Sequence, residues 1–459
     1  MKISIQWLRD YVELPEGETP EQIAHDLTMS TVEVERIDDL SLALRGIVAA
    51  RVRTCVPHPG AEKLQIVTCE LGDAGERVVV CGGTNVAEGM MVALGLPGAV
   101  VTGRDGRPLT LAPTEIRGVA SAGMICSAGE LGLSELLPSA ADKHIIDLQG
   151  WEASPGQPLA EVLGYDDVVL EIDNKSLTNR PDLWSHHGIA RELAALYDRP
   201  LAEVPAVPPP KGPGALSVQI EAPQHCYRYT ATRIEGVSVA PSPPWMRSRL
   251  ARIGIRPINN LVDLTNYVMV ALGQPSHAFD ARDVEHGIVV RHARAGESLT
   301  LLDTSSHALT GDTLVIAEAE RPVALAGVMG GDRGVRDDTT ALLLELASFE
   351  PVGVRRTARR FGLRTESSSR FEKGVDTARV DLALGAMLAL LPQICPGARA
   401  TAHLDAFPTP PQPVSVSVGL DYIRRRLGED LPDDQIRGLL DRLGFEPKLD
   451  GDRLAVLVP

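Results

Sequence analysis

The sequence predicts a multidomain α+β protein, and three observations support this. At 459 residues the chain is too long for one ordinary hydrophobic core, so three or more domains are expected. Short β-like runs alternate with stretches in which apolar residues recur at helical spacing. The 34 prolines and 42 glycines mark frequent turns between these runs. Together they indicate several cores built from both helices and strands.

The first predicted domain is a small α/β unit made of residues 1–40 and 151–200. Thr19 followed by Pro20 is a favourable helix start, because threonine caps the helix and proline suits its first position. Residues 31–37 alternate in polarity as a strand does. The two parts are separated in sequence, so the intervening segment is predicted to be an inserted domain.

That inserted segment, residues 41–150, is predicted to form a small β-barrel, because short β-like runs alternate with turn residues. Three segments read HPGAEKL at 58–64, CGGTNV at 81–86 and IRGVASAGMICSAGELGL at 116–133. In this order they resemble the tRNA-binding OB-fold module. The curved sheet of such a barrel suits extended nucleic acid. The segment is poor in basic and aromatic residues, so a small contribution to tRNA affinity is expected.

Further boundaries follow from composition. Residues 201–215 are rich in proline and are predicted to be a linker. Residues 216–400 are expected to form a large α+β domain, with a helix at 351–361 that ends at Gly362. Residues 401–459 are expected to begin another domain of strands and helices. Because the chain stops on an apolar strand, we expect this last domain to be incomplete and the chain to be a fragment.

Charge and composition exclude several classes of protein. A formal net charge of −16 disfavours a generic, charge-driven nucleic-acid binder. No apolar run approaches the length of a membrane span, and the first residues contain no apolar signal segment. The six cysteines are dispersed without a CxxC pair, which indicates reduced thiols and not a disulfide framework or a zinc site. A cytoplasmic location is therefore expected.

The stretch that stands out is 256–280, RPINNLVDLTNYVMVALGQPSHAFD. Thr265 and Asn266 interrupt an aliphatic run, and His277 follows a glycine and a proline closely. Buried polar groups are costly unless they are hydrogen-bonded. This pattern indicates either a satisfied polar network in a core or the wall of a site.

Six segments in a fixed order resemble the β-subunit family of bacterial phenylalanyl-tRNA synthetases. They are MKISIQWLRDYV, the barrel segments, NRPDLWSHHGIARE, the 256–280 stretch, LAGVMGG and GLRTESSSRFEKGVD. The resemblance implies a B1-like first domain, a B3/B4-like editing domain at 216–400 and the start of a B5-like domain. It also implies an α2β2 heterotetramer with an α subunit and tRNA(Phe) as a partner. ATP and Mg²⁺ would serve the whole complex, with the family's magnesium ligands beyond Pro459 and none in this chain.

The resemblance further implies that the central domain hydrolyses tyrosyl-tRNA(Phe). Such editing is needed because an activation pocket rejects an added hydroxyl poorly, whereas a second pocket that hydrogen-bonds this hydroxyl discriminates well. Glu345, in the otherwise apolar segment ALLLELASF, is the candidate reader of the hydroxyl; the alternative is a glutamate on a strand edge facing solvent. His277 is the candidate that orients or deprotonates water; the alternative is a histidine capping a turn.

Other residues are assigned to the pocket by the same resemblance. Thr265 and Asn266 are expected to bind the amino group or terminal ribose of the substrate, and Arg256 to contact phosphate or brace the pocket. The remaining predicted pocket residues are Ala326, Gly327, Thr365 and Ser367. The chain departs from the family pattern T-E-A-S-H-R here, because Ser367 replaces alanine and Ser369 replaces histidine. We expect this departure to affect the strength of tyrosine discrimination.

A local basic patch is predicted on the helix expected at 351–361. Like charges at i,i+4 repel unless a polyanion covers them, so the patch is a candidate contact for the acceptor end of tRNA; a solvated helix face is the alternative. Predicted tRNA-binding residues are Arg355, Arg356, Arg359 and Arg360 in this patch, with Lys63 and Asn85 in the barrel. Two other functions stay open at this point: a free-standing trans-editing deacylase and a non-catalytic tRNA-binding scaffold.

Overall fold

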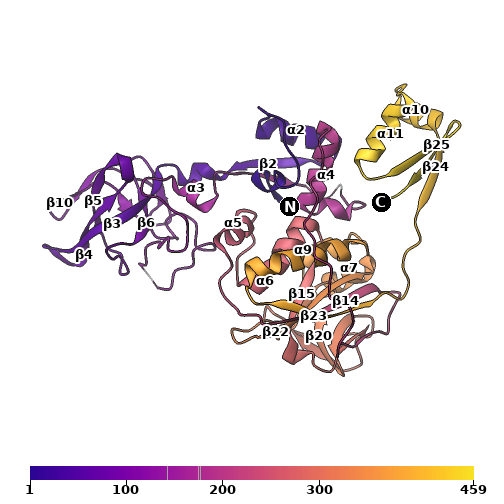
Figure 1. Cartoon of the computed structure of the whole chain (residues 1–459). Helices are drawn as coiled ribbons and strands as arrows, with labels where there is room; N and C mark the ends of the chain where they lie inside the picture. The colour runs from indigo at the N-terminus through magenta and orange to yellow at the C-terminus, as the bar shows by residue number, and fades with distance from the viewer. Residues whose placement is uncertain (142, 174, 176) are drawn as a thin grey trace.

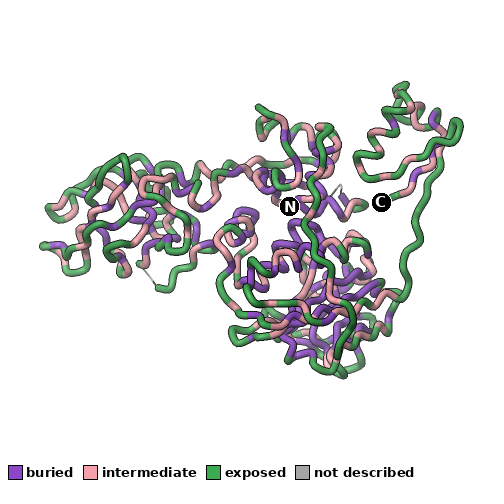
Figure 2. The backbone as a smooth tube through the Cα atoms, viewed as in Figure 1, coloured by how far each residue is buried: buried purple, intermediate pink, exposed green. Residues whose placement is uncertain are grey.

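The computed structural model describes residues 1–141, 143–173, 175 and 177–459. Figure 1 shows four sheet-containing units; an extended connection leads from the central unit to the C-terminal one, which lies beside the N-terminal unit. Residues 408–417 of this connection are exposed, as Figure 2 shows. The multi-sheet α+β class predicted from the sequence is confirmed.

The N-terminal unit is a three-stranded antiparallel sheet in the order β1-β12-β2. Helix α2 begins with Thr19 accepting a hydrogen bond from the Gln22 amide at 3.2 Å, as predicted. The following strand starts later than predicted, because Thr31 still closes α2 through a bond to the Leu27 carbonyl. Its elements are β1 (Lys2–Ser4), α1 (Ile5–Leu8), α2 (Pro20–Ser30), β2 (Val34–Asp39), β12 (Val168–Ile172) and α4 (His186–Tyr197).

The barrel unit is a five-stranded antiparallel sheet in the order β11-β6-β3-β4-β5. Its edge strands β11 and β5 also contact each other, so the sheet curls toward closure. Two buried clusters fill it. The elements are β3 (Ile47–His58), β4 (Ala61–Glu70), β5 (Glu76–Cys81), β6 (Met91–Gly95), β7 (Val100–Thr102), β8 (Pro108–Thr110), β9 (Thr114–Ile116), β10 (Val119–Ser121), β11 (Met124–Ile125) and α3 (Leu159–Leu163).

The central unit has two sheets packed through one shared core. The first is antiparallel, in the order β15-β22-β14-β23, and the second has the order β13-β16-β19-β20-β21. Their strands are β13 (Val218–Ile220), β14 (Cys226–Glu235), β15 (Ser276–Asp280), β16 (Ile288–His292), β19 (Leu314–Glu318), β20 (Arg321–Leu325), β21 (Met329–Gly330), β22 (Ala341–Phe349) and β23 (Arg399–Ala406), with a separate hairpin of β17 (Ser298–Thr300) and β18 (Ser306–Ala308).

Helices cover the outer face of the first sheet and one end of the unit. A second core joins the outer face of the sheet to α5, α6 and α9. Helix α7 ends at Gly362 in the left-handed conformation, as the sequence predicts. These helices are α5 (Pro244–Arg252), α6 (Asn260–Leu272), α7 (Pro351–Phe361), α8 (Glu366–Phe371) and α9 (Arg379–Ile394).

The C-terminal unit is small, with the sheet order β24-β26-β25 and a core of four buried residues. Its elements are β24 (Ser415–Gly419), α10 (Leu420–Leu427), α11 (Asp433–Arg442), β25 (Glu446–Asp450) and β26 (Arg453–Leu457). The predicted linker at 201–215 is packed against α9, where the Val207 amide bonds to the Gly385 carbonyl at 2.9 Å. A side chain at Gly385 would clash with Ala206, which explains the glycine in this helix.

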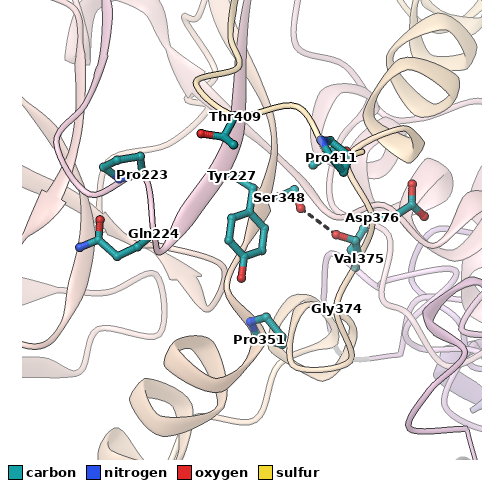
Figure 3. Close-up of a pocket in the computed structure, with 11 residues that line it drawn as sticks. Pro223, Gln224, Tyr227, Ser348, Pro351, Gly374, Val375, Asp376, Thr409 and Pro411 are labelled. Atoms are coloured by element: carbon teal, nitrogen blue, oxygen red, sulfur yellow. Dashed lines mark hydrogen bonds between the residues drawn. The ribbon is translucent and has the colours of Figure 1, made fainter. Parts of the chain in front are cut away.

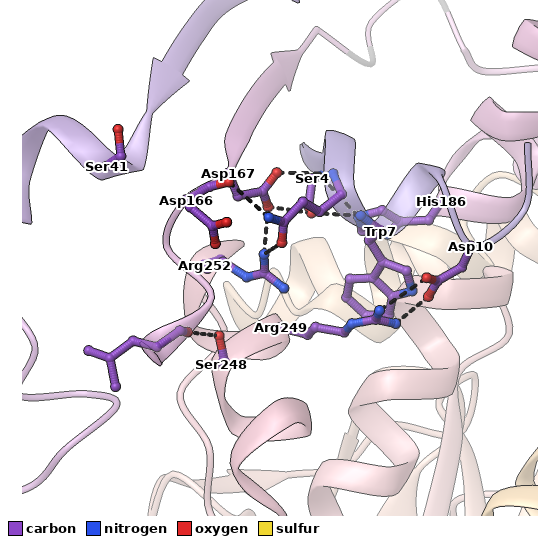
Figure 4. Close-up of polar contacts among 12 residues, drawn as sticks. Ser4, Trp7, Asp10, Ser41, Asp166, Asp167, His186, Ser248, Arg249 and Arg252 are labelled. Carbon is purple, nitrogen blue, oxygen red and sulfur yellow. Dashed lines mark hydrogen bonds and ion pairs between the residues drawn. The ribbon is translucent and has the colours of Figure 1, made fainter. Parts of the chain in front are cut away.

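Buried polar contacts fix the N-terminal unit against α5 (Figure 4). Arg252, almost fully buried, pairs with Asp167 at 2.8 Å, and the same carboxylate accepts the Ser4 hydroxyl at 2.5 Å. Nearby, Arg249 pairs with Asp10. Breaking a buried ion pair on one side leaves an uncompensated charge. These contacts therefore hold the two units in one fixed arrangement.

Candidate functional site

A small cavity of about 50 Å³ lies between the two sheets of the central unit and is closed on one side by α8. Space of this size accommodates a water molecule or two. The lining residues come from the turn before β15, from β15, β19, β20 and β21, from the turn that joins the last two, from β22 and from α8: Pro275, Ser276, His277, Ile316, Ala324, Leu325, Gly327, Val328, Met329, Gly330, Glu345, Ser367 and Phe371.

Strand register places His277 and Glu345 side by side. They are direct partners in the antiparallel pairing of β15 with β22, so their side chains leave the same face of the sheet. Leu344 and Leu346, which flank Glu345 on β22, point the opposite way, into the core beneath α6 and α9. The only two ionisable side chains among the described lining residues thus meet in one cavity.

Glu345 is buried, with 7% of its surface exposed. Burial raises the pKa of its carboxyl to about 7, against the opposing effect of a hydrogen bond from Tyr229. The Tyr229 hydroxyl donates to Oε2 at 2.9 Å. The predicted alternative, a solvent-facing glutamate on a strand edge, is wrong because β22 lies between β15 and β14.

Burial lowers the pKa of His277 to about 4, so its imidazole is neutral near pH 7. Its Nε2 atom is shielded from solvent and has no hydrogen-bond partner among the described residues, and the Ser276 hydroxyl beside it is in the same condition. A Cβ added at Gly330 would lie 2.5 Å from His277 Cε1. Glycine at this position is therefore needed for the ring to occupy its place.

Two further elements form the cavity wall, the turn at Gly327 and helix α8, while the predicted pocket residues Ala326 and Thr365 do not line it. Gly327 lines the cavity with a φ of +69°, a conformation that favours glycine, while Ala326 is buried behind it. Ser367 lines the opposite side from α8. Thr365 caps α8 and donates its hydroxyl to the Val328 carbonyl at 2.7 Å, which ties the helix to the Gly327 turn.

Helix α8 is also anchored to the N-terminal unit. Arg370, 1% exposed, donates from Nε to the Trp184 carbonyl at 3.1 Å and from Nη1 to the Glu366 carboxylate at 2.6 Å. Lys373 lies 5.6 Å from the centre of the Trp184 ring. The wall that carries Ser367 is thus held by a contact that crosses from one unit to the other.

Thr265 and Asn266, which were assigned to the pocket as contacts for the substrate, lie outside the cavity. Both lie on α6, which packs on the opposite face of the sheet, and neither lines the cavity. The Thr265 hydroxyl donates to the Val262 carbonyl at 2.6 Å within its own helix. Arg256 is also outside the cavity: its side chain is 72% exposed and lies 3.4 Å from the Glu135 carboxylate of the barrel unit.

The predicted tRNA-binding residues fall into two groups, those that are exposed and unpaired among the described residues and those that are already paired within the chain. Arg355, Arg356 and Arg359 are exposed on α7, and none of them has an ion-pair partner in the described part of the chain. Arg360 differs, because Asp312 pairs with it at 2.6 Å and neutralises it.

In the barrel, Lys63 is exposed beside a groove of about 920 Å³. Asn85 uses both ends of its amide on the Ile145 backbone, at 2.8 and 3.1 Å. It therefore braces the barrel, and its amide is not directed outward as a tRNA-binding role would require.

A second cavity in the central unit is larger and apolar (Figure 3). It has a volume of about 770 Å³ and is lined mainly by Pro223, Tyr227, Pro351, Val375 and Pro411. Its edge is held by a hydrogen bond of 2.7 Å from the Ser348 hydroxyl to the Val375 carbonyl. It lacks the paired ionisable groups that the small cavity has, so it is the less suitable place for hydrolysis.

Sequence reasoning did not single out Tyr229, whose hydroxyl donates to the Glu345 carboxyl group. A tyrosine in an alternating strand reads as an ordinary core residue. The signal that reveals it is strand register: Ala231 pairs with Glu345, which places Tyr229 diagonally across from the carboxylate on the same face. Among the described residues, no group of three or more His, Cys, Asp or Glu side chains is arranged to hold a metal ion. In the same part of the chain, every helix is too short or too polar to cross a membrane.

Two domain families and a set of relatives match this chain. The B3/4 domain family matches residues 225–396, which contain the small cavity, and the putative tRNA binding domain family matches residues 47–149. The phenylalanine--tRNA ligase beta subunit of Anaeromyxobacter dehalogenans is 43% identical over 469 aligned residues, covering 100% of this chain and 56% of the relative. Over its whole length, the chain is similar to phenylalanine--tRNA ligase beta subunits.

A second beta subunit, from Gloeobacter violaceus, is 41% identical over 100% of this chain and 57% of its own length. The chain thus spans somewhat more than half the length of the beta subunits that it matches. An N-terminal fragment of the beta subunit from Pyrococcus horikoshii aligns with a TM-score of 0.33 and 18% identity, over 64% of this chain and 82% of the fragment. That likeness is too weak to bear on the fold.

Proposed function

We propose that the chain acts as part of a phenylalanine--tRNA ligase beta subunit and that its small cavity hydrolyses tyrosyl-tRNA(Phe). The single observation that carries this proposal is the pairing of His277 and Glu345 on one face of the β15–β22 ladder, inside one cavity. The imidazole of His277 is suited to act on water, and the carboxyl group of Glu345 is suited to bind a phenol hydroxyl. The match of the B3/4 and beta subunit families supports the same assignment.

The chemistry follows from the state of each group. His277 is neutral near pH 7, so an imidazole nitrogen can accept a proton from water that attacks the ester carbonyl. The cavity has room for this water, and Nε2 of His277 has no hydrogen-bond partner among the described residues. A tyrosyl side chain is larger than the cavity, so substrate binding has to displace part of the wall.

Other parts of the chain are proposed to bind tRNA and a separate α subunit. The exposed arginines of α7 lie on the helix that follows β22, and Arg355, Arg356 and Arg359 are available for phosphate contacts. The barrel at 47–149 matches a putative tRNA binding domain. Aminoacylation with ATP and Mg²⁺ is assigned to the α2β2 complex, and none of the cavity residues takes part in it. A free-standing deacylase or a non-catalytic scaffold is not favoured, because the matched relatives are named as ligase subunits.

Deacylation of purified tyrosyl-tRNA(Phe) tests the proposal. We expect the chain to release tyrosine, and His277→Ala to slow release about 100-fold, the usual contribution of a general base. Glu345→Ala should bring the rate on tyrosyl-tRNA toward the rate on phenylalanyl-tRNA. His292→Ala, which removes a partly buried histidine of the neighbouring sheet, is the matched control and should retain activity. Release no faster than in buffer would contradict the proposal.

A further inference from the structure

Tyr229 lies at the centre of the first sheet of the central unit. It is fully buried on β14, between β22 on one side and β23 on the other. Its hydroxyl donates to Glu345 Oε2 at 2.9 Å. No described residue donates a hydrogen bond to Oε1, the other oxygen of the carboxyl group. One oxygen is therefore occupied by the protein, and the other is free on a residue that lines the cavity.

A buried tyrosine–glutamate pair needs an explanation beyond packing. The surrounding core is apolar, with Ile316, Leu325 and Phe371 among the neighbours in the shared cluster and the cavity wall. Burying a carboxyl group here is costly, and an apolar pair of similar volume would avoid that cost. Tyr229 donates one hydrogen bond, to Oε2, whereas a carboxylate can accept about four. Oε1 receives no hydrogen bond from a described residue and is open to a donor that enters the cavity.

We propose that Tyr229 is a specificity-determining residue, whose hydroxyl fixes the Glu345 carboxyl group so that Oε1 is presented to the hydroxyl of a tyrosyl substrate. This inference rests on the proposed function of the cavity. The phenol of Tyr229 is the same chemical group as the phenol that the cavity is proposed to select. The protein thus supplies one phenol donor to Oε2, and the substrate supplies a second to Oε1.

The electrostatic surroundings support this role. The titratable groups facing Glu345 are Tyr229 and Cys226 on β14 and His277 on β15, all neutral near pH 7. The second sheet and α8 contribute only uncharged residues to the cavity lining. No cationic side chain of the described residues compensates the carboxylate, so the hydrogen bond from Tyr229 is the contact that favours its charged, acceptor form. A phenylalanyl ring offers no donor to such an oxygen, whereas a tyrosyl hydroxyl does.

Tyr229→Phe tests the proposal, because it removes one oxygen and keeps the ring. Discrimination is measured twice: as the ratio of deacylation rates on tyrosyl- and phenylalanyl-tRNA(Phe), and as the ratio of calorimetric affinities for the non-hydrolysable amides tyrosyl- and phenylalanyl-3′-amino-adenosine. We expect both ratios to fall about tenfold. The tyrosyl preference of the wild-type chain should vary with pH near 7, and the variant should show this change at higher pH.

Tyr227→Phe is the matched control, since it makes the same change two residues away on the same strand, where the side chain is 36% exposed. It should leave both ratios unchanged. Ratios and pH profile unaltered by Tyr229→Phe would overturn the inference while leaving the deacylase intact. Equal loss in the two variants would overturn it as well. A wild-type chain that discriminates in binding but hydrolyses neither ester would overturn only the hydrolytic function.

Discussion

The two cavities of the central unit differ in what their size indicates. The apolar cavity at Tyr227 and Pro351 measures about 770 Å³, and the cavity at His277 and Glu345 about 50 Å³ (Figure 3). Among the described lining residues, only those of the small cavity bring a histidine and a glutamate together in an apolar setting, and the histidine Nε2 has no hydrogen-bond partner there. Perturbed pKa values in such a setting are typical of functional sites. The larger volume of the apolar cavity therefore does not make it the better candidate for a catalytic site.

The largest loss of deacylation is expected from Gly330→Ala, which alters the small cavity. The new methyl group would lie 2.5 Å from the His277 ring, so the ring must move. A misplacement of about 1 Å in a catalytic group can cost about 100-fold in rate, and we expect a 10- to 100-fold loss of tyrosyl-tRNA(Phe) deacylation. Gly334→Ala is the control, because a Cβ there meets only Leu302 at 3.8 Å. Full activity of Gly330→Ala would show that the position of the ring does not matter.

A second test measures how much the buried carboxyl group of Glu345 lowers the free energy of unfolding. The pKa of Glu345 is about 7 in the fold against an ordinary 4.5, so the protonated form is favoured in the native state. The stability it supports is present below pH 4.5 and lost as the pH rises through 7. Glu345→Gln, which stays neutral, should raise the free energy of unfolding at pH 8 by on the order of 3 kcal/mol, and by less than about 1 kcal/mol at pH 5.

Urea unfolding at the two pH values checks this difference. Glu235→Gln is a suitable control, because that glutamate forms only a partly exposed pair with Arg233, and such pairs contribute about 1 kcal/mol or less. An equal gain from Glu345→Gln at both pH values would mean that the burial of charge is not its cause.

The smallest effect is expected at the apolar cavity. Tyr227→Ala enlarges a cavity that is already open and removes no group from the small one. Deacylation of tyrosyl-tRNA(Phe) should stay within about twofold of the wild-type rate, a change of less than about 0.5 kcal/mol in barrier. A loss of tenfold or more would break the contrast and assign the larger cavity a part in the reaction.

Local signals in the sequence predicted many elements well. The cap at Thr19, the end of α7 at Gly362 and the strand at 288–292 each follow from residues that lie next to one another. His277 and Glu345 were also predicted as site candidates, because a polar residue within an apolar run is easy to recognise in a sequence. The β15–β22 register places them opposite each other, and their catalytic roles stay predictions.

The errors have one physical origin. Thr265 and Asn266 are close to His277 in sequence, yet Gly273 reverses the chain after α6, and the strand that follows presents alternate residues to opposite faces. Proximity along the chain therefore did not predict proximity in space. Tyr229 was missed for the converse reason: 116 residues separate it from Glu345, and only the β14–β22 ladder brings them together.

The contact between Arg370 and the Trp184 carbonyl limits how far the central unit can be treated as a module. Excising residues 216–406 would leave a guanidinium, now almost completely enclosed, without that acceptor and open to solvent on one side. The first turn to loosen would be the short helix that carries Ser367. Transplanting the cavity into another scaffold thus requires the 181–186 loop as well as the domain that contains the catalytic candidates.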